Sequence, residues 1–308
     1  MSTYIARLRK LFRLLWTCSA PLTAVCWLML ADTVIASLGL ALDSRQLAGV
    51  PVWMKPFKFG ISTALYTGTL AWLCGFVNAK RAAWVTAVGL AIEIVIVDFQ
   101  AARGVSSHFN NASGPDALLF SVMGGLIAVV WVAGIIVAIA LFRHKFADAG
   151  WGWALRLGLA VSLVGAATGG LMTVPTSAQL ASLRAGLPTP AMGAHTVGAA
   201  DGGPAIPLTG WSAEHGDLRV PHFVGLHAMQ LIPLLAWWVG RRRVRVNTVF
   251  EIAACYGGLM VILAWQALRG QALIHPDGAT LVALALWLAA CMVVLTRAYA
   301  GRVYEATA

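Results

Sequence analysis

The segment DFQAARGVSSH at residues 98–108 ends an apolar stretch, and it recurs as AWQALRGQALIH at residues 264–275. Both copies read Gln-Ala-x-Arg-Gly with a histidine shortly after. A Pro-Asp pair follows each copy, at residues 115–116 and 276–277, and suits the first turn of the next helix. Because such polar residues are rare in apolar helices, their recurrence favours an internal duplication.

Two further pairs of segments recur in the same order along the chain. Residues 56–75 align without gaps on residues 221–240, and SRQLA at 44–48 resembles SAQLA at 177–181. The duplicated unit is therefore expected to contain several helices rather than one motif.

The composition is that of a membrane protein. Of 308 residues, 59% are hydrophobic and 11% are charged, whereas a soluble domain has about 25% charged residues. Eight apolar stretches approach the roughly 20 residues that cross a bilayer. They cover residues 14–42, 57–78, 82–104, 117–142, 152–175, 221–240, 247–268 and 278–299. We expect an all-α integral membrane fold with eight transmembrane helices.

Four helices in each copy return the chain to the side on which it entered. The two copies, residues 1–145 and 146–308, are therefore expected to form a parallel 4+4 repeat related by rotation about the membrane normal. The second copy contains an insertion at about residues 182–219, rich in Gly and Pro and carrying Trp211. A loop this long within a compact protein is typically functional, and we expect an ordered cap over the outer mouth.

The net charge of +10 follows the predicted topology. Lys and Arg gather in alternate loops, including RRRVR at residues 241–245, as the positive-inside rule requires. This predicts a bacterial inner-membrane protein with both termini in the cytoplasm. The basic charge is thereby explained by orientation and requires no nucleic-acid partner. The expected partners are the lipid bilayer and a small-molecule or anionic ligand at the outer face, while the sequence indicates no oligomeric state.

Most histidines fall near the predicted outer face. His222 and His227 are five residues apart, so they diverge by about 140° on a regular helix and cannot bind one metal as an i, i+4 pair does. Gln230 lies one turn beyond His227. We expect a polar centre in the outer half of the membrane. Its predicted lining residues are Gln100, Arg103, His108, His222, His227, Gln230, Gln266 and Arg269.

The two repeated arginines, Arg103 and Arg269, allow two interpretations. They could snorkel to lipid phosphates. Alternatively, each could join the Gln three residues before it, Gln100 or Gln266, to clamp an anion such as a carboxylate, a phosphate or a haem propionate. The sequence leaves both open.

Acidic residues within apolar stretches are expensive unless they are paired or neutral. Asp98 could pair with Lys58, and Asp32 lies in the first stretch. Glu93 has no evident cationic partner in the sequence and is the best candidate for a proton relay. Glu93, Asp98 and His227 are the predicted catalytic acid–base groups.

Two motifs carry a resemblance. SHFN at residues 107–110 and GDLRVPHFVGLHAMQ at residues 216–230 resemble segments of bacterial polytopic inner-membrane proteins of unassigned function. The resemblance implies no particular activity.

Two functions fit these observations. The first is a redox enzyme that uses haem b or a transition metal ion, with His108, His227 and His275 as candidate ligands. The alternative is a proton-coupled transporter or channel for a small solute, neutral or anionic, with the acidic residues carrying the proton. The sequence favours the redox enzyme, because a polar site open to one face suits an enzyme better than a conduit.

Overall fold

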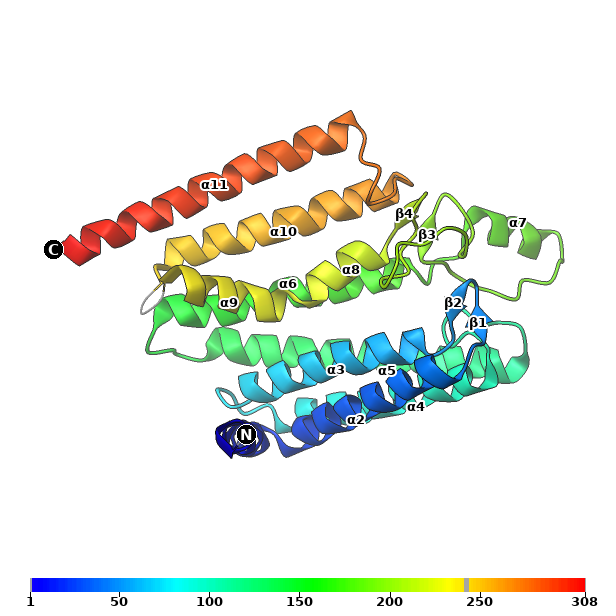
Figure 1. Cartoon of the computed structure of the whole chain (residues 1–308), viewed down its shortest axis with the longest axis horizontal. Coiled ribbons are helices and arrows are strands. Elements are labelled where there is room, and N and C mark those ends of the chain that lie inside the picture. The colour runs from blue at the N-terminus through cyan, green and yellow to red at the C-terminus, as the bar shows by residue number, and fades with distance from the viewer. Residues whose placement is uncertain (1, 241–243, 308) are drawn as a thin grey trace. The chain divides into compact units, whose positions relative to one another are not determined.

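The computed structural model of the chain describes residues 2–240 and 244–307 and is mostly helical (Figure 1). It divides into two compact units. The first comprises residues 1–144 and 175–193, and the second comprises residues 145–174 and 194–308. Three arginines of the RRRVR cluster, Arg241, Arg242 and Arg243, lie outside the described residues.

The first unit is a helical bundle with one small hairpin. Its helices are α1 (Ser2–Cys18), α2 (Ala20–Leu42), α3 (Met54–Leu73), α4 (Lys80–Arg103), α5 (Gly114–Arg143) and the short α7 (Ser177–Arg184). Helix α2 packs mainly on α3, and α4 packs on α5 and also contacts α2 and α3. The hairpin joins β1 (Gln46–Leu47) to β2 (Val50–Pro51) through Ala48 and Gly49, which both have positive φ as a tight hairpin turn requires.

The second unit is built around α6 (Ala149–Leu171). This helix packs against α8 (Arg219–Leu226), α9 (Ala228–Gly240) and α10 (Val246–Leu268), and α11 (Gly278–Thr307) packs on α10. Small and branched side chains fill this core, with Ala154, Ile232, Ala236 and Val249 fully buried. Strands β3 (Thr196–Val197) and β4 (Gly216–Asp217) pair beside α10.

Among the described residues, six helices are long and apolar enough to cross a membrane. They are α2, α4, α5, α6, α10 and the Gly278–Tyr299 part of α11. Helices α8 and α9 meet at a bend of 52° and would form a seventh span if taken together. The all-α membrane class is therefore supported, but the predicted count of eight is not reached. The predicted span at residues 57–78 corresponds to α3, which falls short of the same criterion.

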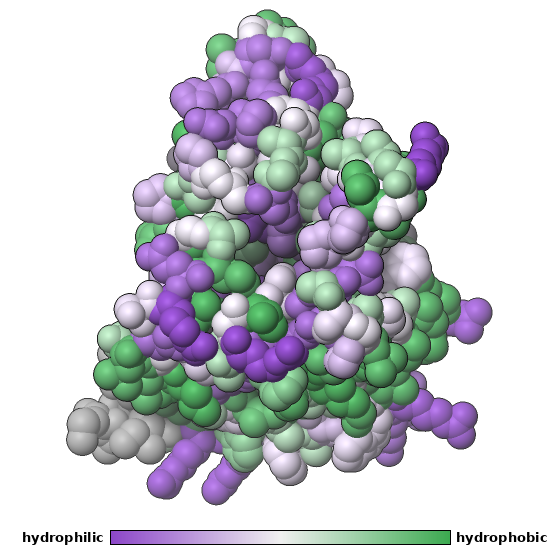
Figure 2. Space-filling model, turned by 90° about the vertical axis from the view of Figure 1, so that its right-hand side faces the viewer, coloured by the Kyte–Doolittle hydropathy of each residue, from purple (hydrophilic) through white to green (hydrophobic). Residues whose placement is uncertain are grey.

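The surface agrees with this class. Figure 2 shows, on one face, hydrophilic residues over the upper and central part and a band of hydrophobic residues along the lower part. Large apolar side chains such as Val34, Val95 and Leu286 are more than half exposed on α2, α4 and α11, as expected for helices that face lipid.

The first predicted span, residues 14–42, is in fact two helices. Helix α1 ends at Cys18, and Ser19 adopts an extended conformation before α2 begins at Ala20. Pro21 lies in the first turn of α2, where its missing N–H costs nothing. In Figure 1 α1 is seen end-on while α2 runs across the view, so the two helices differ strongly in direction.

The insertion at residues 182–219 has defined structure and is divided between the two units. Residues up to 193 group with the first unit, where Met192 N–H donates to Phe109 O and Asn111 N–H donates to Pro190 O. The remainder groups with the second unit, and Gly216 packs directly against the carbonyl of Ala267 at the end of α10.

Candidate functional site

The loop after α4 folds back toward the bundle. Gly104 ends α4 with φ +73°, a left-handed conformation that glycine adopts without strain. Asn110 then donates to the carbonyl of Ser106 at 2.8 Å, and Ser106 Oγ donates to the carbonyl of His108 at 2.8 Å. These local hydrogen bonds fix the SHFN segment.

The loop brings His108 onto Glu93. The distance from His108 Nε2 to Glu93 Oε1 is 3.6 Å, although Glu93 lies ten residues before Arg103, about 15 Å along the helix axis. The Glu93 side chain is 4% exposed and the His108 side chain is 22% exposed. The Ser107 hydroxyl lies 3.2 Å from His108 Nδ1. His108 is therefore positioned between a buried carboxyl group and a more accessible loop.

A cation from α3 complements this pair. Lys55 acts electrostatically on Glu93, and its ammonium group lies 5.6 Å from the centre of the Phe59 ring. That ring also makes an edge contact with the ring of His108, at 5.6 Å between centres. Lys55 and His108 thus both contact the Phe59 ring, and both act on Glu93.

A second acidic group lies in the same unit. The carboxyl groups of Asp32 on α2 and Asp98 on α4 lie close enough to share a hydrogen bond. Gly60 of α3 is packed against Asp32, because a Cβ atom there would lie 3.0 Å from Asp32 Oδ2 and 2.5 Å from Thr33 Oγ1. The absence of a side chain at Gly60 lets α3 approach the acidic pair closely.

The buried oxygens of these acids are incompletely satisfied. Asp32 Oδ2, Glu93 Oε2 and Asp98 Oδ1 are buried without a hydrogen-bond partner. Three orphaned carboxyl oxygens in one unit are unusual, since buried polar atoms are normally paired. They mark this region as a place where protons or a ligand would complete the bonding.

Both repeated arginines have carboxylate partners in the structure. Arg103 Nη1 donates to Asp116 Oδ1 at 2.6 Å and to Gln100 Oε1 at 2.5 Å, and Gln100 Nε2 donates to the same aspartate at 2.9 Å. Ser113 caps α5 beside them. In the first unit, Arg103 and Gln100 tie the end of α4 to the start of α5.

The second copy of the motif makes corresponding contacts in the second unit. Arg269 is ion-paired with Asp277, and Gln266 Nε2 donates to the carbonyl of Ala272 at 2.8 Å. Gly270 ends the segment with φ +73°, the same value as Gly104. Each arginine therefore pairs with the aspartate of the Pro-Asp dipeptide that follows it in the chain. Neither interpretation from the sequence, snorkelling to lipid or clamping an anion, had included this partner.

His222 and His227 lie in the second unit at a break between helices. His222 Nδ1 is 2.9 Å from the carbonyl of Gly165, and His227 ends α8. Side chains cover carbonyls near the break, with Ser162 Oγ donating to Leu226 O at 2.8 Å and Tyr256 OH donating to Val224 O at 2.5 Å. Gln230 lies within hydrogen-bonding reach of His227.

The predicted metal ligands are not gathered into a cluster. His108 belongs to the first unit, while His227 and the exposed His275 belong to the second. Within residues 2–240 and 244–307, no three His, Cys, Asp or Glu side chains are arranged to hold a metal ion.

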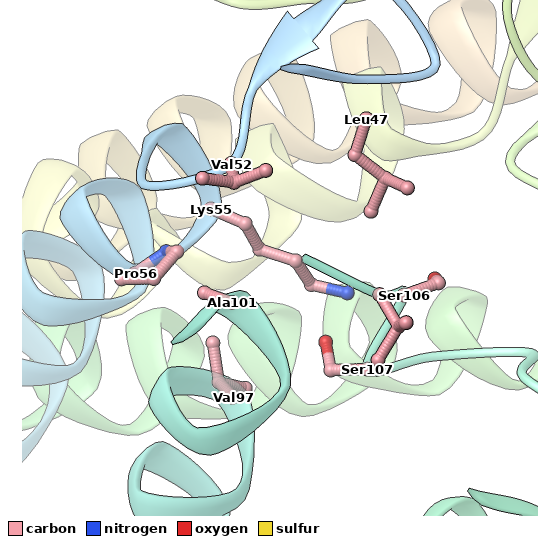
Figure 3. A pocket seen from close by; sticks show the side chains of 9 residues that line it. Leu47, Val52, Lys55, Pro56, Val97, Ala101, Ser106 and Ser107 are labelled. Carbon is pink, nitrogen blue, oxygen red and sulfur yellow. The ribbon is translucent and has the colours of Figure 1, made fainter. Parts of the chain in front are cut away.

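A small cavity lies beside the Lys55 group. Its volume is about 40 Å³, and its walls come from the hairpin, α3, α4 and the loop after α4. Figure 3 shows the Lys55 ammonium group reaching across it towards Ser106 and Ser107, with Val97 of α4 on another wall. Lys55 is the one charged residue among the nine described residues that line it.

Sequence reasoning missed Lys55. The available signal was the presence of two lysines, Lys55 and Lys58, near the start of one apolar helix. The electrostatic effect of Lys55 on Glu93 cannot be read from the sequence, because the two residues are 38 positions apart.

No family model, characterised protein or solved structure matches this chain.

Proposed function

We propose that this chain is a proton-coupled membrane transporter for a small solute, with the proton-binding groups in its first unit. The observation that carries the proposal is the carboxyl pair of buried Asp32 and half-buried Asp98, accompanied in the same unit by Glu93 and His108.

The physical argument begins with the cost of charge in an apolar bundle. A carboxylate within a membrane costs at least a few kcal/mol unless it is paired or neutral. Two carboxyl groups in direct contact cannot both be ionised without strong repulsion, so the pair holds a proton. A group that must hold a proton in one arrangement can release it when a nearby charge or water changes, which is what proton coupling requires.

His108 supplies a route between solvent and Glu93. Histidine gains and loses a proton near neutral pH, and this one contacts the buried carboxyl with one ring nitrogen while its side chain remains 22% exposed. A proton arriving at His108 can therefore pass to Glu93 without bare charge crossing apolar surface.

The contacts give less support to the haem interpretation. Arg103 and Arg269, the expected propionate partners, are bound to Asp116 and Asp277. His108 contacts Glu93, and His222 contacts a backbone carbonyl. Carboxyl groups, rather than a set of histidines, dominate the buried polar region, and acid–base chemistry suits them better.

We further propose that the chain spans a bacterial inner membrane eight times, as a parallel 4+4 repeat with both termini in the cytoplasm. Support comes from treating α8 and α9 as one bent span and α3 as another. Helix α3 has 20 residues and packs closely on α2, with Gly60 at the contact. The corresponding contacts of the two Gln-Ala-x-Arg-Gly segments favour the duplication.

Infrared difference spectroscopy tests the proton-binding groups on which the proposal depends. When the full-length protein in lipid is moved from about pH 6 to about pH 9, carboxyl groups with ordinary pKa values near 4 are ionised throughout. We therefore expect loss of carbonyl-stretch bands only from carboxyl groups that the apolar bundle holds protonated. Asp98→Asn and Glu93→Gln should each remove part of this signal, whereas Glu251→Gln, which changes an acid of the second unit near Arg297, should not. Unchanged bands in both test variants would refute the proposal.

A further inference from the structure

We propose that the cavity beside Lys55 binds a small monovalent anion, and that its binding is coupled to protonation of Glu93. This inference rests on the proposed function and names the class of solute that the proton accompanies.

The chemistry of the cavity favours an anion. An ammonium group has three donors and no acceptor, and Lys55 places it inside the cavity. Leu47, Val52 and Val97 provide apolar walls, which disfavour a strongly hydrated or multiply charged ion. An acceptor-only, weakly hydrated anion fits this combination.

The size of the cavity limits the anion. A water molecule needs about 10–15 Å³ of such volume, so about 40 Å³ accommodates a few heavy atoms. Formate, nitrate and chloride are of this size. Larger anions such as gluconate would not enter without rearrangement of the hairpin.

The hairpin holds the cavity open from one side. Arg45 binds Asp43 through its guanidinium group, with Arg45 Nη2 to Asp43 Oδ2 at 2.6 Å, and donates to the carbonyl of Ala102 at 3.1 Å. Trp53 Nε1 also donates to Asp43, at 2.9 Å. These bonds anchor the segment that carries Leu47 and Val52 to the end of α4.

Coupling follows from the shared cation. While Glu93 is ionised, it attracts Lys55 and competes with any anion for the ammonium charge. Once His108 delivers a proton to Glu93, that competition ends and the anion can bind. Proton and anion thus enter together, and the net charge in the apolar region stays nearly constant.

The other charged groups around Glu93 are already engaged with one another. On α2 and α4, Asp32 faces Asp98. On α5, Asp116 bonds Arg103. Lys58 of α3 is half-buried and does not line the cavity. His108 and Lys55 are therefore the titratable partners through which Glu93 responds.

The test uses full-length protein in proteoliposomes with a trapped pH dye. Inward gradients of formate, nitrate or chloride should each be tried against gluconate. For the wild type, we expect acidification of the lumen driven by one or more of the small anions and not by gluconate. Lys55→Gln should weaken the apparent anion affinity about tenfold or more, as expected for loss of a charged hydrogen bond.

Matched variants separate the charge from the fold. Lys55→Arg should retain most of the transport, and Lys80→Gln, an exposed lysine at the start of α4, should retain all of it. Val52→Phe fills the cavity without removing charge and should reproduce the loss. Glu93→Gln should leave anion entry independent of pH and uncoupled from acidification.

Failure of the anion site can be distinguished from failure of the proposed proton-binding groups. If the infrared bands of the carboxyl groups respond to pH as described but no small anion drives acidification, the anion site is refuted and the proton site stands. If Lys55→Gln and Val52→Phe transport anions like the wild type, the anion uses another route and the inference is likewise refuted. If the infrared bands are unchanged in the acid variants, both proposals fail.

Discussion

At the residue scale, the decisive feature is that charges in the apolar bundle occur in groups. Glu93 has His108 and Lys55, Asp98 has Asp32, and Arg103 has Asp116. Grouping reduces the cost of burial, but it does not remove it where orphaned oxygens remain. The acids with orphaned oxygens are therefore the ones to which the proposed function assigns the proton, whereas the Arg103 set is fully bonded.

Substitution of Arg103 distinguishes a structural pair from an anion clamp. Arg103→Gln should lower the melting temperature in detergent, because it leaves the buried Asp116 carboxylate with fewer partners. Arg269→Gln should lower it less, since both partners of that ion pair are about one-third exposed. A loss of anion-driven transport with unchanged melting temperature in Arg103→Gln would contradict the structural role.

The loop at residues 194–218 contains a pH-sensitive contact. Burial alone would raise the pKa of Asp201. Hydrogen bonds and positive charge from His195, together with a hydrogen bond from the backbone N–H of Thr196, lower that pKa overall. A lowered carboxyl pKa gives stability that is present at neutral pH and lost as pH falls through the folded-state value. Asp201→Asn should mimic that loss at neutral pH and increase proteolysis within residues 194–218. Cleavage equal to that of the wild type would show that the contact does not hold the loop.

At the element scale, the breaks in helices are the informative positions. Helices α8 and α9 are separated at His227, and Pro233 within α9 removes a further backbone donor. Irregular backbone at membrane depth is tolerated only where other groups satisfy it. Ser162 of α6 and Tyr256 of α10 meet this requirement by bonding carbonyls at the break.

Removing either hydroxyl should destabilise the bend. Ser162→Ala and Tyr256→Phe should each cost about 1 kcal/mol of unfolding free energy, the usual value for one hydrogen bond. Ser121→Ala is the control, because its exposed hydroxyl bonds only within its own helix. Equal stability of Ser162→Ala and Ser121→Ala would show that the Leu226 carbonyl finds another donor.

Helix α1 has the pattern of an interfacial helix rather than a span. Leu8 and Leu11 are exposed, while Phe12 and Leu15 turn towards the rest of the unit. Four basic residues accompany the exposed apolar ones: Arg7, Arg9, Lys10 and Arg13. Such a combination lies along a bilayer surface with its apolar side inserted.

Spin labels test this orientation. Labels at positions 8 and 11, which share one helix face, should report the same depth in the bilayer if α1 lies in the interface. If α1 crosses the membrane, their depths should differ by about 1.5 Å per residue. Labels at Leu28 and Ile35 of α2 provide the spanning reference.

At the scale of the whole molecule, the number of membrane crossings decides which loops lie on which side of the membrane. With eight spans, the loops after α4 and α10 share one side, and the loops after α3 and α5 share the other. If α3, or the bent pair α8 and α9, does not cross the membrane, every loop after that point moves to the opposite side.

Cysteine accessibility should settle the count. Single cysteines at Ser44, Asn78 and Ala112, which are all exposed, flank α3 and α4. In a background without native cysteines, Asn78 should react with impermeant reagents from one side of the membrane, and Ser44 and Ala112 from the other. A cysteine at Ile274, in the exposed loop after α10, should react from the same side as Ala112. Labelling of Asn78 from the same side as Ser44 would exclude α3 as a span, and labelling of Asn78 from the same side as Ala112 would exclude α4.

Some features could be predicted from the sequence because they are local. Apolar length identifies the membrane class, and Gln100-Ala-Ala-Arg103-Gly104 identifies the end of α4, since a glycine cap and a last-turn arginine are signals read over a few residues. Glu93 stands out for the same reason, as an acid in an apolar run. The structure supports each of these local assignments.

The partners of those residues depended on the tertiary structure. The SHFN loop folds back so that His108 reaches Glu93, and the missing Cβ of Gly60 lets α3 approach Asp32 closely. Neither contact follows from helical periodicity, because contacts between residues far apart in sequence depend on which helix faces meet and at what height. Lys55 shows this most clearly. Its sequence neighbours indicate only the start of a helix, whereas the packing of α3 beside α4 brings its ammonium group under the influence of Glu93 and into the cavity.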